Sequence, residues 1–215
     1  MRIYLEPTLI IDSDNEFIQK TAHDITSNTQ TDREKAVGLF YFVRDQIVYN
    51  PYVDRHLPDH FVASATLARG RGFCIQKAVV LVALSRAASI PARLGFAVIR
   101  NHLLPEKLAR TLVTNEIPDH GYAELYIKGK WVKATPAFDL TTCHEHRIVP
   151  VDFDGVNDAI FHRLNQDGAL HIEYVKDNGR YADLPIVEIE AWVASGITPE
   201  AQEMILNGKY PWQKD

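Results

Sequence analysis

Residues 70–78 read Gly-Arg-Gly-Phe-Cys-Ile-Gln-Lys-Ala. In this stretch a cysteine follows a glycine-containing segment and lies just before an apolar run. That run, residues 78–84, predicts a buried helix. Cys74 would then lie at the helix N-terminus, where unpaired N–H groups and the helix dipole favour a thiolate. Lys77 is expected on the same helix face as a nearby cation. The pattern indicates a nucleophile; the alternative is a small apolar residue that opens a core helix.

A histidine that can act with Cys74 lies in a predicted β-hairpin. Residues 119–127 alternate in the manner of a strand, Lys128-Gly129 marks a two-residue turn, and the chain returns as a second strand. The residues that flank this turn are expected to pair. His120 lies in the first strand, and a histidine base beside a cysteine is a common way to activate a thiol nucleophile.

The order of these elements resembles the transglutaminase-like superfamily, whose members include papain-like cysteine proteases and amidases. The resemblance covers about residues 31–140 and rests on three blocks: Gly72-Phe73-Cys74 before an alanine-rich helix, Ile90-Pro91-Ala92-Arg93 entering a strand, and His120-x-Tyr122-x-Glu124-x-Tyr126 ahead of Gly129-Lys130-Trp131. It implies an α+β, papain-like or transglutaminase-core fold. N-terminal helices, with the nucleophile helix among them, would pack on an antiparallel β-sheet. It also implies that Cys74 and His120 are catalytic.

The third catalytic residue is where this sequence departs from the superfamily. The family usually places an aspartate four residues after the tryptophan and before a proline, and here that position is Thr135. In the predicted hairpin register, Thr135 and Asp139 are both diagonal neighbours of His120. We predict Asp139 as the orienting residue, because a carboxylate also stabilises an imidazolium. Thr135 is the alternative, because it has the family position and Pro136 can end the strand pairing before Asp139.

The chemistry implied by Cys74 and His120 is acyl transfer through a thioester. Cys74 would attack the carbonyl of a peptide, protein or small amide, and His120 would protonate the departing amine. The Cys74 backbone N–H is the expected oxyanion donor, and the Gln76 side chain is a second candidate. Hydrolysis is the predicted outcome, because water is always available. Amine transfer or amide formation in a small-molecule pathway is one alternative, and an inactive binding module, favoured by Thr135, is another.

The composition is that of an ordinary globular protein. The chain has 215 residues, 46% of them hydrophobic and 24% charged, with a formal net charge of −5. Such a charge gives no basic surface for nucleic acid or anionic membrane, and no run approaches the ~18 apolar residues of a membrane span. With no long apolar N-terminal stretch, we expect a cytoplasmic protein in which Cys74 and Cys143 stay reduced. No cofactor or metal is expected, because residues 143–146 (Cys-His-Glu-His) lack the spacing of zinc ligands.

The chain is expected to form one transglutaminase-like domain over residues 1–215. Its core would cover about residues 31–140, and residues 141–215 would be an elaboration that walls one side of the cleft, held by Trp192 and Trp212. Helices are expected at residues 14–27, from a capping box at Thr31, at 64–69, 74–88, 106–114 and 199–207, the last with Gly208 as its C-cap; strands are expected at 2–11, 92–99 and 171–175.

Overall fold

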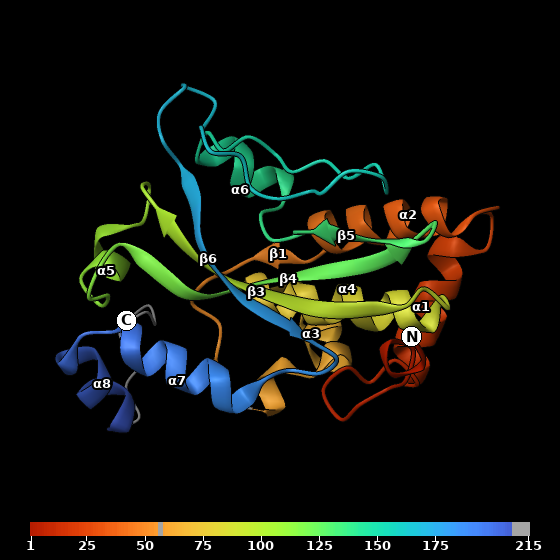
Figure 1. Cartoon of the computed structure of the whole chain (residues 1–215), viewed down its shortest axis with the longest axis horizontal. Helices are drawn as coiled ribbons and strands as arrows, with labels where there is room; N and C mark the ends of the chain where they lie inside the picture. The colour runs from red at the N-terminus through yellow and green to blue at the C-terminus, as the bar shows by residue number, and fades with distance from the viewer. Residues whose placement is uncertain (56–57, 208–215) are drawn as a thin grey trace.

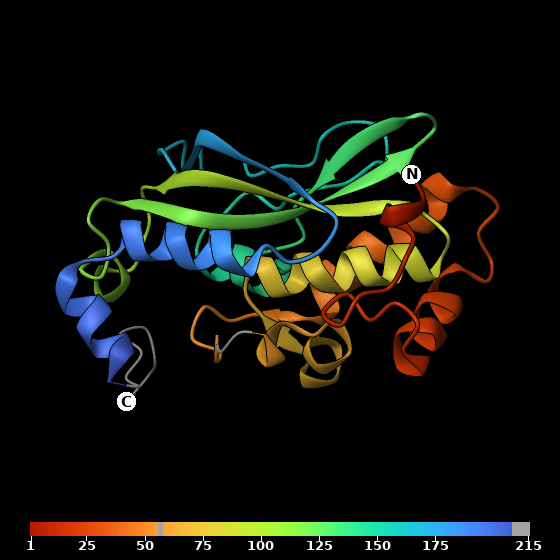
Figure 2. The same ribbon diagram turned by 60° about the horizontal axis from the view of Figure 1, so that its bottom comes forward.

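A four-stranded antiparallel sheet forms the centre of the computed structural model, which describes residues 1–55 and 58–207. The strand order is β5-β4-β3-β6, with bounds β3 Ala92–Asn101, β4 Glu116–Ile127, β5 Lys130–Ala134 and β6 Ile172–Tyr181 (Figure 1). Helices lie along one face of this sheet, as Figure 2 shows: α1 Glu16–Thr26, α2 Asp32–Gln46, α3 Ala63–Arg69 and α4 Cys74–Ala87. The predicted α+β arrangement is confirmed.

Helix α4 is the core of the molecule. Every residue from Ile75 to Arg86 is buried, and α4 contacts α1, α2, α3, β3 and β4. This surrounding protein is the reason why a helix that is apolar on all sides is stable here. The helix begins where predicted, because Phe73 is extended and the Gln76 side chain accepts a hydrogen bond from the Phe73 N–H.

The N-terminal segment differs from the sequence prediction. Residues 2–11 do not form a strand: they contain a short 3-10 helix, Arg2–Tyr4, and a local turn. In that turn Thr8 N–H donates to the Ile11 carbonyl and Ile11 N–H donates to Thr8 Oγ1. These groups are satisfied locally and are not available for a sheet. Helix α1 is capped by Asn15, and the capping box at Thr31 is confirmed at the start of α2.

The hairpin turn is confirmed, but the strand pairing is shorter than predicted. Ile127 pairs with Lys130, and Lys128 and Gly129 both have positive φ, at 49° and 87°, as a two-residue primed turn requires. The β4–β5 pairing ends at Ala134, after which the chain turns to the segment around residue 159. The predicted register is confirmed as far as Ala134, but His120 has no partner on β5, so Asp139 is not its diagonal neighbour.

The C-terminal segment adds a strand and two helices to the core. Strand β6 pairs with β3 and is longer than the predicted 171–175, and α7 (Ile186–Gly196) was not predicted. Trp192 on α7 packs against Phe96 and Tyr181. Helix α8, Pro199–Leu206, has the predicted Thr198 cap. Gly208 and Trp212 lie outside the described residues.

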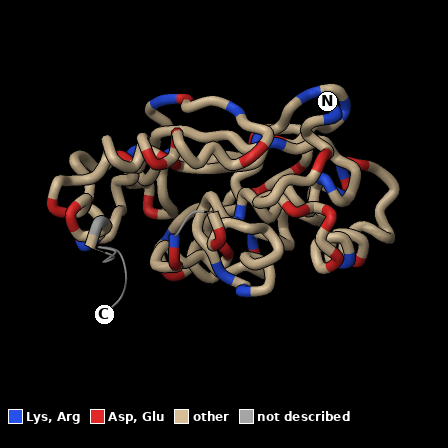
Figure 3. Tube along the Cα trace, turned by 90° about the horizontal axis from the view of Figure 1, so that it is seen from below, with Lys and Arg blue, Asp and Glu red and all other residues tan. Residues whose placement is uncertain are grey.

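Short elements complete the fold. Strands β1 (Val48–Tyr49) and β2 (Arg71–Gly72) pair in parallel just before α4, and the remaining helices are η2 (Asp59–Phe61), α5 (Glu106–Ala109) and α6 (Leu140–Glu145). Acidic and basic residues are interspersed along the chain in Figure 3. Within residues 1–55 and 58–207, none of the helices combines the length and the apolar character needed to cross a bilayer.

Candidate active site

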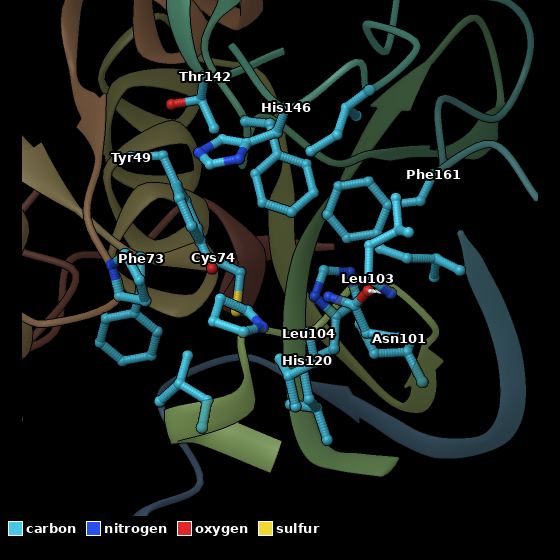
Figure 4. A pocket seen from close by; sticks show the side chains of 18 of the residues that line it. Tyr49, Phe73, Cys74, Asn101, Leu103, Leu104, His120, Thr142, His146 and Phe161 are labelled. Carbon is cyan, nitrogen blue, oxygen red and sulfur yellow. Dashed lines mark hydrogen bonds between the residues drawn. The ribbon is translucent and has the colours of Figure 1, made fainter. Parts of the chain in front are cut away.

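A cleft of about 1150 Å³ is lined by both Cys74 and His120. Cys74 reaches it from the first residue of α4 and His120 from the middle of β4. Figure 4 shows the two side chains in this cleft, with Tyr49, Phe73 and Phe161 around them. Elements that are far apart in the sequence thus bring the predicted nucleophile and base to one solvent-accessible space.

The start of α4 touches β4 at Gly121, the residue after His120. A Cβ atom at this position would lie 3.0 Å from Cγ1 and 3.1 Å from Cα of Ile75. Only glycine allows the helix backbone to approach the strand this closely. The consequence for Cys74 is direct, since hydrogen bonding from the backbone amides of Gly121 and Ile75 acts on its thiol.

The thiol of Cys74 is neutral at physiological pH. Burial and the charge of Asp119 raise its pKa to about 11, while the amides of Gly121 and Ile75 and the charge of Arg55 act in the opposite direction. The expected stabilisation of a thiolate by the helix N-terminus is therefore present but outweighed. Burial is decisive because it penalises the charged form of any acid.

His120 is a buried, neutral imidazole. The side chain is 1% exposed, and burial lowers its pKa to about 3. Its ring packs against Phe161, with 4.8 Å between ring centroids. Of the described residues, Tyr174 on β6 is the one that meets its ring nitrogens, with Oη 3.4 Å from Nε2.

Asp139 performs a different task from the one predicted. It caps α6, where its two carboxylate oxygens accept hydrogen bonds from the N–H and hydroxyl of Thr142, and Oδ2 also accepts from the Tyr49 N–H at 2.8 Å. Burial raises the pKa of this carboxyl, but these hydrogen bonds outweigh that effect and lower it. The sequence prediction that Asp139 orients His120 is not supported by these contacts.

Thr135, the alternative third residue, is buried directly after β5. Its N–H donates to the Ala159 carbonyl, and its Oγ1 makes no close hydrogen bond among residues 1–55 and 58–207. The hydroxyl is nevertheless near enough to Tyr174 to affect that phenol. Burial raises the pKa of Tyr174 to about 12, and hydrogen bonding with Phe161 and Thr135 lowers it.

Two polar residues near Cys74 serve the fold. Nζ of Lys77 donates to the carbonyls of Arg44 and Ile47, at 2.9 and 2.5 Å, and so caps the end of α2; burial lowers the pKa of Lys77 to about 7. The Gln76 amide donates to the carbonyls of Asp54 and His60. Lys77 thus binds the end of α2. Gln76, the second candidate for an oxyanion donor, instead binds carbonyls of the loop before α3.

Glu124 on β4 and Trp131 on β5, two residues of the sequence motif, help to hold the strands of the sheet together. Glu124 is buried and forms ion pairs with Arg93 on β3, at 2.7 Å, and with Arg180 on β6. The guanidinium of Arg93 lies 4.0 Å from the centre of the Trp131 ring. These contacts bind β3, β4, β5 and β6 to one another and so fix the position of His120.

Cys143 is buried in α6, and neither it nor Cys74 forms a disulfide. The neighbouring His146 lines the cleft (Figure 4). Among the described residues there is no group of three side chains placed to hold a metal ion. Glu145 and His146 of this segment are part of the cleft wall.

Sequence reasoning missed two residues of the site, Asp119 and Tyr174. Asp119 stands beside the predicted histidine, so its position was a usable signal. Tyr174 lies 54 residues from His120. Nothing local in the sequence links the two, and only the pairing of β3 with both β4 and β6 brings them together.

The solved structures similar to this chain include two from bacterial proteins. One, named a "putative cysteine protease from Cytophaga hutchinsonii", is 21% identical with a TM-score of 0.49, over 83% of this chain and 53% of that one. The other, named a "putative protease from Parabacteroides distasonis", is 14% identical with a TM-score of 0.43, over 59% of this chain and 24% of that one. The chain thus spans about half the length of the first of these proteins.

A comparison with curated proteins found no match. A family model, described as the transglutaminase-like superfamily, matches residues 19–136. That range is more than half of the chain; it begins within α1, ends just after β5, and includes Cys74 and His120. The resemblance seen in the sequence is thereby confirmed, and this protein belongs to the transglutaminase-like superfamily.

Proposed function

We propose that this protein is a cysteine-dependent acyl-transfer enzyme that hydrolyses an amide through a thioester on Cys74. The observation that carries the proposal is the position of the Cys74 thiol. It lies at the N-terminus of α4, in the cleft that His120 also lines, and the backbone amide next to His120 acts on it.

The reaction starts from a neutral thiol and a neutral imidazole, in accordance with their pKa values of about 11 and about 3. His120 takes the thiol proton as the sulfur of Cys74 attacks the amide carbonyl, and the carbonyl electron pair moves to oxygen. When the pair returns, the C–N bond breaks and the amine leaves with the proton of His120. Water then attacks the thioester and gives a proton to His120, and the thiol and a carboxylic acid are released.

The oxyanion formed in each step needs hydrogen-bond donors. The N–H of Cys74 is the first of α4, and helix N–H groups at this position have no partner inside the helix. We assign it as one donor, and such a donor contributes about 3 kcal/mol in comparable sites.

The cleft suits an amide with an apolar group. One part of its wall is apolar and comes from β4, the segment around α5, and α7: Leu104, Leu108, Leu112, Ile117, Val193 and Ile197. Another part is polar and comes from α6 and the segment after it, with Thr141, Thr142, Glu145 and His146. A peptide, a protein segment or a small amide with one apolar side chain fits this division, because burial of that side chain contributes about 1.5–3 kcal/mol.

The test is acylation by p-nitrophenyl acetate, with the acetylated peptide identified by mass spectrometry. We expect a burst of p-nitrophenol and an acetyl group on Cys74, both lost in Cys74→Ala. Cys143→Ala is the matched control, because it removes the other thiol, and it should keep the burst. An unchanged burst in Cys74→Ala would refute the proposal.

The same acyl-enzyme distinguishes hydrolysis from amine transfer. Added hydroxylamine or glycinamide competes with water for the thioester, and the fraction of amide product measures the competition. A dominant amide product at millimolar amine would favour a transferase. If the ester does not acetylate Cys74 of the native protein at any pH, the result would favour an inactive binding module, the alternative suggested by Thr135.

A further inference from the structure

Asp119 places a carboxylate in the wall of the cleft, close to the nucleophile. The β4–β5 pairing does not reach this part of β4, so the strand borders the cleft with residues 117–120. Two residues after Asp119, Gly121 touches the first turn of α4. Asp119 therefore lies beside the start of the helix that begins at Cys74, and its charge acts on that thiol.

The Asp119 side chain is largely removed from water, yet no cation is paired with it. The residue is 8% exposed. In the part of the chain that the structure describes, its carboxylate forms no ion pair and no hydrogen bond to another residue. Arg55 is the cation whose charge acts on it, but that guanidinium lies 4.1 Å from the ring centre of Phe73 and donates to the Pro51 carbonyl. Carboxylates are rarely buried without a partner, so such a side chain in a cleft indicates a ligand.

The charge of the cleft as a whole also favours a cation. Two arginines and four acidic residues are among the described residues that line it: Arg55, Arg147, Asp119, Asp139, Glu145 and Asp167. Two positive and four negative charges give a formal net charge of −2 when the histidines are neutral. Asp167 is paired with Arg147, and Asp139 accepts hydrogen bonds at the start of α6. Glu145 is exposed, which leaves Asp119 as the buried carboxylate available to a ligand.

We propose that Asp119 is a specificity-determining residue that binds an ammonium or guanidinium group of the substrate. The substrate class is then an amide that carries a positive charge near the bond that is cleaved. The proposal rests on the proposed function, because it names the substrate of that reaction.

A bound cation would also change the nucleophile. Burial and the charge of Asp119 raise the pKa of Cys74. A cation on Asp119 neutralises that charge, so the thiolate forms more readily once the substrate is in place. A neutral amide lacks this effect and meets the thiol at its raised pKa. The preference for a cation therefore acts both on binding and on the attack by sulfur.

Methanethiosulfonates of different charge measure this preference without an acyl-enzyme. Cys74 of the Cys143→Ala protein is modified at pH 7 by the 2-aminoethyl, methyl and 2-sulfonatoethyl reagents. Each rate is divided by the rate with free 2-mercaptoethanol. All three reagents react with the same thiolate, so the ratios report charge preference and not the pKa of the thiol. We expect the cationic reagent to react about tenfold faster than the anionic one, or more, because a hydrogen bond to a charged group contributes at least that factor.

Two variants assign the preference to its residue. Asp119→Asn keeps the size of the side chain, removes its charge and should lose the preference. Glu188→Gln is the matched control, because it removes an exposed negative charge on α7, outside the cleft, and should keep the preference. A preference that survives in Asp119→Asn would overturn the proposal. If Asp119→Asn does not fold, the native protein still decides: a cationic preference supports the proposal, and equal normalised rates overturn it.

Two p-nitrophenyl esters of equal chain length extend the test to the acylation of Cys74. The 6-aminohexanoate carries an ammonium group where the heptanoate carries a methyl group. The native protein should release p-nitrophenol from the cationic ester about tenfold faster, and Asp119→Asn should lose the difference. If the thiosulfonates show the preference but neither ester acylates Cys74, the cation site stands and the proposed function fails. Acylation by both esters at equal rates would overturn the cation site and leave the proposed function standing.

Discussion

Gly121→Ala should disturb both the stability of the protein and the chemistry of Cys74. The added Cβ would lie 3.0 Å from Cγ1 and 3.1 Å from Cα of Ile75, whereas ordinary contacts begin at 3.4 Å. The first turn of α4 must therefore move away from β4 by a few tenths of an ångström. Since Cys74 is the first residue of that helix, its thiol moves with it.

The size of the effect follows from two opposing terms. Overpacking of a tight contact costs about 1–3 kcal/mol, and alanine recovers about 0.4–1 kcal/mol by restricting the unfolded chain. The net loss is about 1–2 kcal/mol, which lowers Tm by about 2–8 °C for a domain of this size. A misplacement of 1 Å can cost about 10²-fold in rate, so a shift of a few tenths should slow acetylation of Cys74 about fivefold.

Calorimetry and the p-nitrophenol burst measure the two effects. Gly129→Ala is the control: its φ of 87° strains an alanine, but no atom lies within 4 Å of the new Cβ, so it should lose stability without slowing acetylation. Ile75→Ala removes the contact between Cγ1 and the new Cβ. The double variant Ile75→Ala/Gly121→Ala should therefore lose less stability than the sum of the losses in the two single variants. Native Tm and native acetylation rate in Gly121→Ala would refute the argument that this contact sets the position of Cys74.

Three further outcomes follow from the electrostatics of the site. Burial and Asp119 raise the pKa of Cys74 to about 11, so the rate of its alkylation by chloroacetamide should rise with pH from 7 toward 11. Cys74 should be alkylated before Cys143, which is buried. A rate that reaches a plateau below pH 8.5 would contradict the raised pKa. Asp119→Asn removes a charge that raises this pKa and should speed alkylation at pH 8, whereas an unchanged rate would mean that Asp119 does not act on the thiol. Asp139→Asn should cost about 1–2 kcal/mol of stability, because it weakens the cap of α6 and the bond to Tyr49, and should leave acetylation nearly unchanged. Since the folded pKa of Asp139 is lowered, its contribution to stability is present above the unfolded value of 3.8 and is lost as pH falls through the folded value, as acid unfolding monitored by circular dichroism would show. A rate loss of orders of magnitude at native stability would instead restore Asp139 as the orienting residue.

The elements whose cause is local could be predicted from the amino-acid sequence. The all-apolar run after Cys74 predicts a helix that is buried on every side. Lys128-Gly129 predicts the turn, because glycine readily adopts the positive φ that such a turn requires. The capping box at Thr31 fixes the start of α2 in the same way. Cys74 and His120 could be chosen as candidate site residues because the order of these elements resembles that of the transglutaminase-like superfamily.

The role of Asp139, the ionisation of Cys74 and the partner of His120 depend on long-range packing and could not be predicted from local sequence. Asp139 caps α6 because the strand pairing ends at Ala134, and no local pattern states where a ladder stops. The ionisation of Cys74 is set by burial and by Asp119, which outweigh the helix N-terminus that the sequence reveals. Tyr174 meets His120 because β3 pairs with both β4 and β6, a contact between residues 54 apart in the chain. Local sequence encodes backbone preference, whereas desolvation and long-range hydrogen bonds arise only when the strands assemble.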